Sequence, residues 1–223
     1  MSRWKRLVVA GVLAVGVTAL LAAGPAVGQT GIDPDAEKVL RGMTSYLGNL
    51  PAFSVDADVD VEYIDTAGQK LQLNSSGSIL MARPGSYYAQ RHGPFGSFEL
   101  FIDGKSATLS NKDRGIYFQI AAPGTIDGAI DALRFETGLD LSGADLLYAD
   151  AYAGLVTDVT SGVHLGTAWV NGVECDHLAF RAAKVDWQIW VRTGDKPLPM
   201  KYVITTKWMT GAPQYTVKFD DWN

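Results

Sequence analysis

Hydrophobic and polar residues alternate along much of this chain, and the alternation predicts strands. Over residues 52–64, apolar or aromatic side chains take every second position and polar ones lie between them: Phe53, Val55, Ala57, Val59, Val61 and Tyr63 against Ser54, Asp56, Asp58, Asp60 and Glu62. A period of two over so long a run is typical of a strand with one buried and one solvated face. Further strands are predicted at 69–82, 86–92, 97–103, 106–110, 115–121, 160–170, 173–182, 185–193, 199–210 and 214–221.

Turn residues separate the predicted strands. Glycine, aspartate and proline recur between them, and Asn171-Gly172 fits a two-residue hairpin turn. The spacing of about ten residues is typical of an antiparallel meander.

Three segments follow helical spacing instead. Residues 33–48 place Val39, Leu40, Met43, Tyr46 and Leu47 on one stripe, after the capping residue Asp33 and Pro34 at the first helical position. Two shorter helices, at 125–135 and 142–153, interrupt the run of strands, with Thr125 and Ser142 as their N-caps. Because they lie between strands, we interpret them as a lid or plug. The sequence therefore predicts a mainly β (α+β) fold of ten or eleven strands in a single domain, residues 29–223.

The first 28 residues resemble an export signal. Arg3, Lys5 and Arg6 precede an uncharged apolar run over residues 7–23, and small residues lead to a cleavage position before Gln29. This layout predicts a secretory signal peptide at 1–28, with an uncleaved membrane anchor as the alternative. No later stretch is long and apolar enough to predict a transmembrane segment once the signal is removed.

The net charge of the chain limits the classes of partner that it is expected to bind. The net charge is −5, and the three basic residues at the N-terminus leave 16 Lys and Arg against 24 Asp and Glu in residues 29–223. An acidic domain is not expected to bind nucleic acid in general, because such binding needs basic patches. The single cysteine, Cys175, allows neither an internal disulfide nor a cysteine-rich zinc site, so we expect it to be buried as a small apolar side chain.

The strand count has a consequence for ligand binding. A sheet of about ten antiparallel strands curls, and the helices can lie in its concave face. That arrangement produces either a dry core or an apolar cleft between helices and sheet. The candidate lining residues are Phe53, Val55, Val59, Val61, Leu71, Leu73, Phe98, Leu100, Ile102, Trp187, Ile189 and Val191 from strands, with Leu146, Leu147 and Tyr152 from the inserted helices.

The last 50 residues carry a family resemblance. The segments are Val-Glu-Cys-Asp-His-Leu-Ala-Phe at 173–180, Asp-Trp-Gln-Ile-Trp at 186–190, Lys-Pro-Leu-Pro-Met-Lys-Tyr at 196–202 and Phe-Asp-Asp-Trp-Asn at 219–223. Their order resembles a family of predicted bacterial periplasmic proteins of unknown function, similar in fold to LolA and LppX-type lipoprotein and lipid carriers. The resemblance covers most of residues 33–223. It implies a periplasmic location and a LolA-like, strongly curved antiparallel half-barrel whose mouth is closed by helices, and in the carriers that cavity receives acyl chains.

No group of residues predicts catalysis. The acidic row Asp56, Asp58, Asp60 and Glu62 is extended and lacks the coiled, glycine-containing loop of a calcium site, so we interpret it as a solvated outer face. Cys175 and His177 share a strand face, but a nucleophile pair would also need an orienting group. Trp187 and Trp190 differ in parity and should face opposite sides of one strand. We expect no catalytic residue, metal site or cofactor.

Two functions follow from the sequence. The first is a non-enzymatic carrier or sensor that binds a hydrophobic ligand, such as a lipid or a lipoprotein acyl chain, in the cleft. The second is a structural or interaction protein of the envelope, with a filled core, that binds a protein partner. A hydrolase with clustered carboxylates is a third, weaker reading, because no known nucleophile or metal motif is present.

Overall fold

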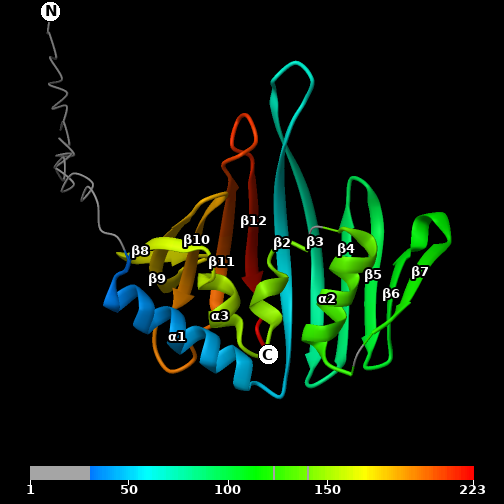
Figure 1. Cartoon of the computed structure of the whole chain (residues 1–223), viewed down its shortest axis with the longest axis horizontal. Coiled ribbons are helices and arrows are strands. Elements are labelled where there is room, and N and C mark those ends of the chain that lie inside the picture. Colours follow the sequence, from blue (N-terminus) through cyan, green and yellow to red (C-terminus); the bar gives the residue numbers. More distant parts are fainter. Residues whose placement is uncertain (1–30, 123, 140) are drawn as a thin grey trace, which may run out of the picture.

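The computed structural model describes residues 31–122, 124–139 and 141–223, so the predicted signal peptide at 1–28 lies outside the described residues. In this part of the chain, twelve strands form one sheet and three α-helices lie on one face of it (Figure 1). The strands are β1 (Gly31–Ile32), β2 (Ala52–Ile64), β3 (Lys70–Ala82), β4 (Ser86–Gly93), β5 (Gly96–Asp103), β6 (Ser106–Asn111), β7 (Ile116–Ala121), β8 (Val159–Val170), β9 (Val173–Ala182), β10 (Val185–Arg192), β11 (Pro199–Thr206) and β12 (Gln214–Asp220). The helices are α1 (Pro34–Asn49), α2 (Ile126–Thr137) and α3 (Ala151–Val156), with 3-10 turns η1 (Lys112–Arg114) and η2 (Ala144–Leu147).

The sheet consists of two meanders joined side by side. Its order is β1-β8-β9-β10-β11-β12-β2-β3-β4-β5-β6-β7, and every neighbouring pair is antiparallel except β1 and β8. The pairing of β12 with β2 is the seam between the meanders, with Val217 opposite Val59. Past the seam, Ser54 and Asn223 exchange two backbone hydrogen bonds of 2.8 and 3.0 Å.

The alternation predicted for residues 52–64 sets the two faces of the sheet. Phe53, Val55 and Val59 are buried on the inner face, which the helices cover, whereas Asp56 is exposed on the outer face. The hairpin turn at Asn171-Gly172 is also confirmed, because both residues have positive φ angles of 50° and 79°, as a type I′ turn requires.

Each longer helix begins at its predicted N-cap, and α2 extends two residues beyond the predicted end at residue 135. The Asp33 carboxylate accepts a 2.8 Å hydrogen bond from the Asp35 backbone N–H, and Pro34 follows as the first helical residue. The Thr125 hydroxyl accepts from the Gly128 N–H, and Gly138 ends α2 in the left-handed region with a φ of 64°. In the apolar stripe of α1, Leu40, Met43 and Leu47 are buried and Val39 and Tyr46 are partly buried, and the helix contacts β8 and β10.

The mainly β architecture with an open curved sheet is confirmed, and the differences are local. The sheet has twelve described strands rather than ten or eleven, because β1 has two residues, too few to show any alternation. The helix predicted at 142–153 is divided into η2 and α3, since Tyr148 is extended and the Asp150 side chain starts a new helix by accepting from the Ala153 N–H. The strand predicted at 199–210 ends at Thr206, where a turn with positive φ at Gly211 and Ala212 begins.

Candidate ligand-binding cavity

A cavity of about 480 Å³ lies between the helices and the centre of the sheet. This volume is within the range of small-molecule pockets, roughly 300–1,000 Å³. Most of its lining is apolar, and the sheet supplies it from both sides of the seam: Phe53, Val55, Ala57, Val59 and Val61 of β2, Ile79 of β3, Tyr87 and Ala89 of β4, Leu100 and Ile102 of β5, and Val217 and Phe219 of β12. The two meanders therefore build one wall together.

The smallest cross-strand pair of the inner face lies in the middle of this wall. Ala57 is opposite Gly77, whereas the neighbouring pairs are Val55 with Ile79 and Val59 with Ser75. A Cβ on Gly77 would lie 2.0 Å from the Gln90 carbonyl oxygen, so only glycine fits where β3 and β4 approach. The wall is consequently thin there, and bare backbone of β3 and β4 lines the cavity.

The helical side of the cavity is formed by a segment that we call the cover, α2 together with η2. Ile126 and Ile130 of α2 and Leu146 and Leu147 of η2 face the sheet, and Leu47 of α1 completes this side. These residues are apolar at helical spacing, which is why burying them against the sheet stabilises the cover.

Polar contacts hold the two parts of the cover together. Arg134 of α2 forms an ion pair of 2.8 Å with Asp145 of η2 and donates a 2.9 Å hydrogen bond to the Tyr148 hydroxyl. The Tyr148 hydroxyl donates in turn to Asp131 at 2.6 Å, and burial, followed by this hydrogen bond, raises its pKa to about 12. A further anchor joins the cover to the sheet, because the Arg83 guanidinium donates to the Leu147 carbonyl at 3.1 Å.

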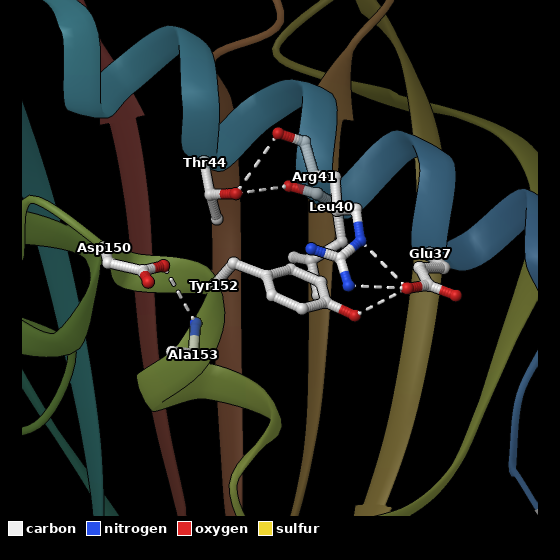
Figure 2. Close-up of polar contacts among 7 residues, drawn as sticks. All are labelled: Glu37, Leu40, Arg41, Thr44, Asp150, Tyr152 and Ala153. Atoms are coloured by element: carbon white, nitrogen blue, oxygen red, sulfur yellow. Dashed lines mark hydrogen bonds and ion pairs between the residues drawn. The ribbon is translucent and has the colours of Figure 1, made fainter.

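Helix α3 is attached to α1 rather than to the cavity. Figure 2 shows Tyr152 lying under α1, where its hydroxyl donates a 3.0 Å hydrogen bond to Glu37 and the Arg41 guanidinium lies 3.6 Å from its ring centroid. Arg41 also pairs with Glu37 at 2.8 Å. The hydrogen bonds from Arg41 and then from Tyr152 lower the pKa of Glu37, while partial burial raises the pKa of Tyr152.

The structure brings eight of the predicted lining residues together around the cavity and leaves seven elsewhere. Those at the cavity are Phe53, Val55, Val59, Val61, Leu100, Ile102, Leu146 and Leu147. Trp187, Ile189 and Val191 lie on the same inner face but are buried in the solid core that α1 covers. Leu71 and Leu73 lie near the turn of the β2–β3 hairpin, where they pair with Tyr63 and Val61. Phe98 lies on β5 opposite Arg91, and the Tyr152 side chain contacts α1.

Several cavity residues were not predicted from the sequence. Tyr87, Ala89, Val217 and Phe219 follow the same alternation as the predicted set, so the strand pattern of 86–92 and 214–221 could have found them. Burial raises the pKa of the Tyr87 hydroxyl far above its ordinary value, which keeps this side chain neutral. Arg91 had no such signal, because a single arginine at an inner-face position of a strand looks like any solvated cation.

The outer face carries the two other groups considered from the sequence. Ser76 and Asn74 donate hydrogen bonds to Asp58 and Asp60, so the acidic row lies on the outer face as predicted. Cys175 is fully buried in a small cluster with Val170 and Met200, and burial raises the pKa of its thiol.

His177 shares the outer face with Cys175, and its ring has other partners. It stacks on Trp190 with centroids 4.0 Å apart and lies 2.9 Å from the Gln188 side-chain oxygen. Trp190 thus faces outward while Trp187 is in the core, as their parity predicts. Among the described residues, no group of three or more His, Cys, Asp or Glu is placed to hold a metal ion.

Comparisons with solved structures identify the fold. The lipoprotein LppX from Mycobacterium tuberculosis has a TM-score of 0.53 to this chain at 12% identity, over 86% of this chain and 96% of LppX. LprF from Mycobacterium bovis has a TM-score of 0.49 at 11% identity, over 85% and 93% of the two chains. A LolA superfamily protein from Nitrosomonas europaea has a TM-score of 0.40 at 9% identity, over 84% and 92%. At these identities the likeness concerns the fold.

The sequence comparisons identify the family. No curated protein matches the chain. The model of a family described as "Predicted periplasmic protein (DUF2092)" matches residues 36–223. Within the described residues, none of the helices has the length and apolar character needed to cross a bilayer. Because the family match spans nearly the whole described chain, from the first turns of α1 to Asn223, the chain belongs to the DUF2092 family and is a periplasmic protein with an LppX-like fold.

Proposed function

We propose that residues 29–223 form one non-enzymatic carrier or sensor domain, which holds a hydrophobic ligand such as a lipid or a lipoprotein acyl chain in the cavity. The observation that carries the proposal is the apolar cavity between the cover and the centre of the sheet. The predicted filled core of an envelope structural protein would leave no space of this size. The LppX-like fold supports the same function.

Burial of the ligand's acyl chain supplies the binding energy. Each methylene group removed from water contributes about 0.8 kcal/mol. A chain that places ten methylenes in the cavity would gain roughly 8 kcal/mol, before the several kcal/mol that association costs. In this proposal the apolar walls supply most of the favourable binding energy, and a polar group adds selectivity.

Native mass spectrometry of protein purified from the periplasm tests the proposal. We expect the wild-type protein to carry a bound lipid, and Ala57→Phe to lose most of it, because Ala57 lies in the cavity wall and the larger ring fills the space beside Gly77. The matched control is Ala52→Phe on the same strand, an exposed position outside the cavity, which should retain the ligand. Repeated absence of lipid from the wild-type protein, with no uptake of added lipid, would contradict the carrier function.

One observation favours binding of a protein partner as a second function. Trp208 is 71% exposed in the turn between β11 and β12, and Phe95 is 70% exposed in the turn between β4 and β5. Exposed aromatic side chains are enriched in protein interfaces. If this function is correct, we expect Trp208→Ser and Phe95→Ser to reduce capture of an envelope partner. Reversal of the charges at Asp56, Asp58 and Asp60 tests whether the partner binds the outer face of the sheet instead.

A further inference from the structure

A positively charged side chain lies at one end of the cavity. Arg91 is on β4, on the same face as Tyr87 and Ala89, and it lines the cavity with them. Its cross-strand neighbours are Gly77 on β3 and Phe98 on β5. Arg91 is itself exposed, and Ala89 on its own strand and Leu100 on β5 are apolar lining residues next to it, so Arg91 is a cation at the edge of an apolar space.

The exposure of β2 shows that this end of the cavity is open. On the inner face of that strand, Phe53 is 6% exposed and Val59 is 8% exposed, whereas Tyr63 is 53% exposed. The same face of one strand thus changes from covered to uncovered between Val59 and Tyr63. Ser75, which binds Arg91, is paired with Val59, so the guanidinium lies where the covered part of the sheet ends.

A hydrogen bond to β3 orients the guanidinium of Arg91. Its Nε donates a hydrogen bond of 2.6 Å to the hydroxyl of Ser75, and Ser75 is buried. This contact uses Nε alone, and the two terminal nitrogens, Nη1 and Nη2, form no hydrogen bond with another side chain or carbonyl of the described residues. They are therefore available to donate to an acceptor outside the sheet.

No carboxylate of the described chain neutralises this charge. None of the six ion pairs found in residues 31–122, 124–139 and 141–223 includes Arg91. Two lysines of the same half of the sheet do have partners, since Lys70 pairs with Glu62 at 2.9 Å and Lys112 with Glu99 at 2.6 Å. Their carboxylate partners, Glu62 and Glu99, take outer-face positions of β2 and β5, whereas Arg91 takes an inner-face position.

We propose that the ligand is an anionic amphiphile, whose acyl chain occupies the cavity and whose carboxylate or phosphate binds the guanidinium of Arg91. This inference rests on the proposed function and specifies the class of its ligand. The planar guanidinium matches the geometry of carboxylate and phosphate groups, to which it donates two parallel hydrogen bonds. A neutral or cationic head group gains no such contact.

Four single-chain probes of equal length test the proposal: dodecanoate, dodecyl phosphate, dodecanol and dodecyltrimethylammonium, titrated into the full periplasmic protein at pH 8 by calorimetry below their micelle concentrations. We expect the two anions to bind about tenfold or more tightly than dodecanol, as one charge-assisted contact predicts. In Arg91→Met this preference should disappear while dodecanol binding is unchanged, because methionine keeps the apolar stem and loses the charge. Arg91→Lys should retain part of the preference.

Arg114→Met is the matched control, since Arg114 is an exposed cation on η1 that does not line the cavity. It should bind all four probes like the wild type. Dodecanol binding also serves as the folding control for Arg91→Met. If anions and dodecanol bind equally, or if Arg91→Met keeps the anion preference, the head-group inference is overturned while the carrier function stands. If none of the probes binds the wild type, both fail.

Discussion

Ala57 and Gly77 show how single small residues decide where this protein is hollow. Along the inner face of β2 and β3, each cross-strand pair contributes a side chain of some size except this one. At Gly77 the backbone of β4 takes the place of a side chain, and Ala57 opposite it contributes only a methyl group to the cavity wall. The least bulky part of the wall is thus formed by a pair of residues 20 positions apart, which only the strand register brings together.

Gly77→Ala is expected to destabilise the protein although it adds only a methyl group. The new Cβ would meet the Gln90 carbonyl oxygen and the Arg91 Cα, and backbone atoms cannot move aside cheaply, so the free energy of unfolding should fall by about 1–3 kcal/mol. Urea unfolding measures the change. The control is Gly42→Ala in α1, where nothing lies within 4 Å of the added Cβ and helix propensity should raise stability by about 0.5–1 kcal/mol. Equal effects of the two variants would contradict the close approach of β3 and β4.

The helices differ in how firmly they are attached. Helix α1 buries Leu40, Met43 and Leu47 in the main core and contacts β8, β10 and α3, whereas α2 contacts β6 and the mostly exposed edge strand β7 and is joined to η2 by the contacts of Arg134. Elements with fewer buried contacts open locally at lower free energy than the core does. The cover is therefore the element whose opening should admit a ligand.

Arg134→Met should loosen the cover without unfolding the sheet. Loss of the contacts with Asp145 and Tyr148 is expected to raise amide hydrogen exchange in residues 141–150, and ligand dissociation, by roughly three- to tenfold, a modest factor because the ion pair is partly exposed. Hydrogen exchange with mass spectrometry measures the exchange in residues 141–150, and stopped-flow displacement measures the rate of ligand dissociation. Arg181→Met, at an exposed position of β9, is the control and should change neither rate. Unchanged exchange in the cover would show that its apolar contact alone holds it.

At the scale of the whole molecule, Trp222 links parts of the chain that are far apart in sequence. Its ring contacts Phe53 of β2 and Phe219 of β12 at centroid distances of 5.3 and 5.6 Å, and its indole N–H donates to the Pro199 carbonyl at 3.1 Å. It also closes one end of the cavity. The same side chain therefore joins the two meanders and bounds the site.

Trp222→Ala is expected to lower the free energy of unfolding by about 2–4 kcal/mol, through the lost contacts and the space left behind. Chemical denaturation monitored by circular dichroism measures it. Trp208→Ala is the matched control, because Trp208 is an exposed tryptophan in the β11–β12 turn and its loss should change stability by less than about 0.5 kcal/mol. A similar loss in both variants would argue against a role of Trp222 at the seam.

The sequence predicted the elements of this fold better than their arrangement. Alternation shows which residues share a face, so the inner positions of β2 and the outward side of Trp190 followed directly from it. It does not show which part of a face a helix will cover, and for this reason Trp187, Ile189 and Val191 were grouped with cavity residues although α1 covers them. Arg91 lacked a signal altogether, because its importance depends on the register that places it beside Gly77 and Ser75.

The pairing of β12 with β2 determines when the cavity wall is completed during folding. Gln214 of β12 donates its backbone N–H to the side chain of Glu62, 152 positions earlier in the chain, whereas the hairpins within each meander join near neighbours. Contacts between distant residues form late in folding, since the loop between them must close first. During synthesis and passage across a membrane, the edge of β2 that pairs with β12 therefore stays unpaired until β12 has been added. The cavity wall needs both strands, so the cavity is complete only once the final strand of the sheet has been added.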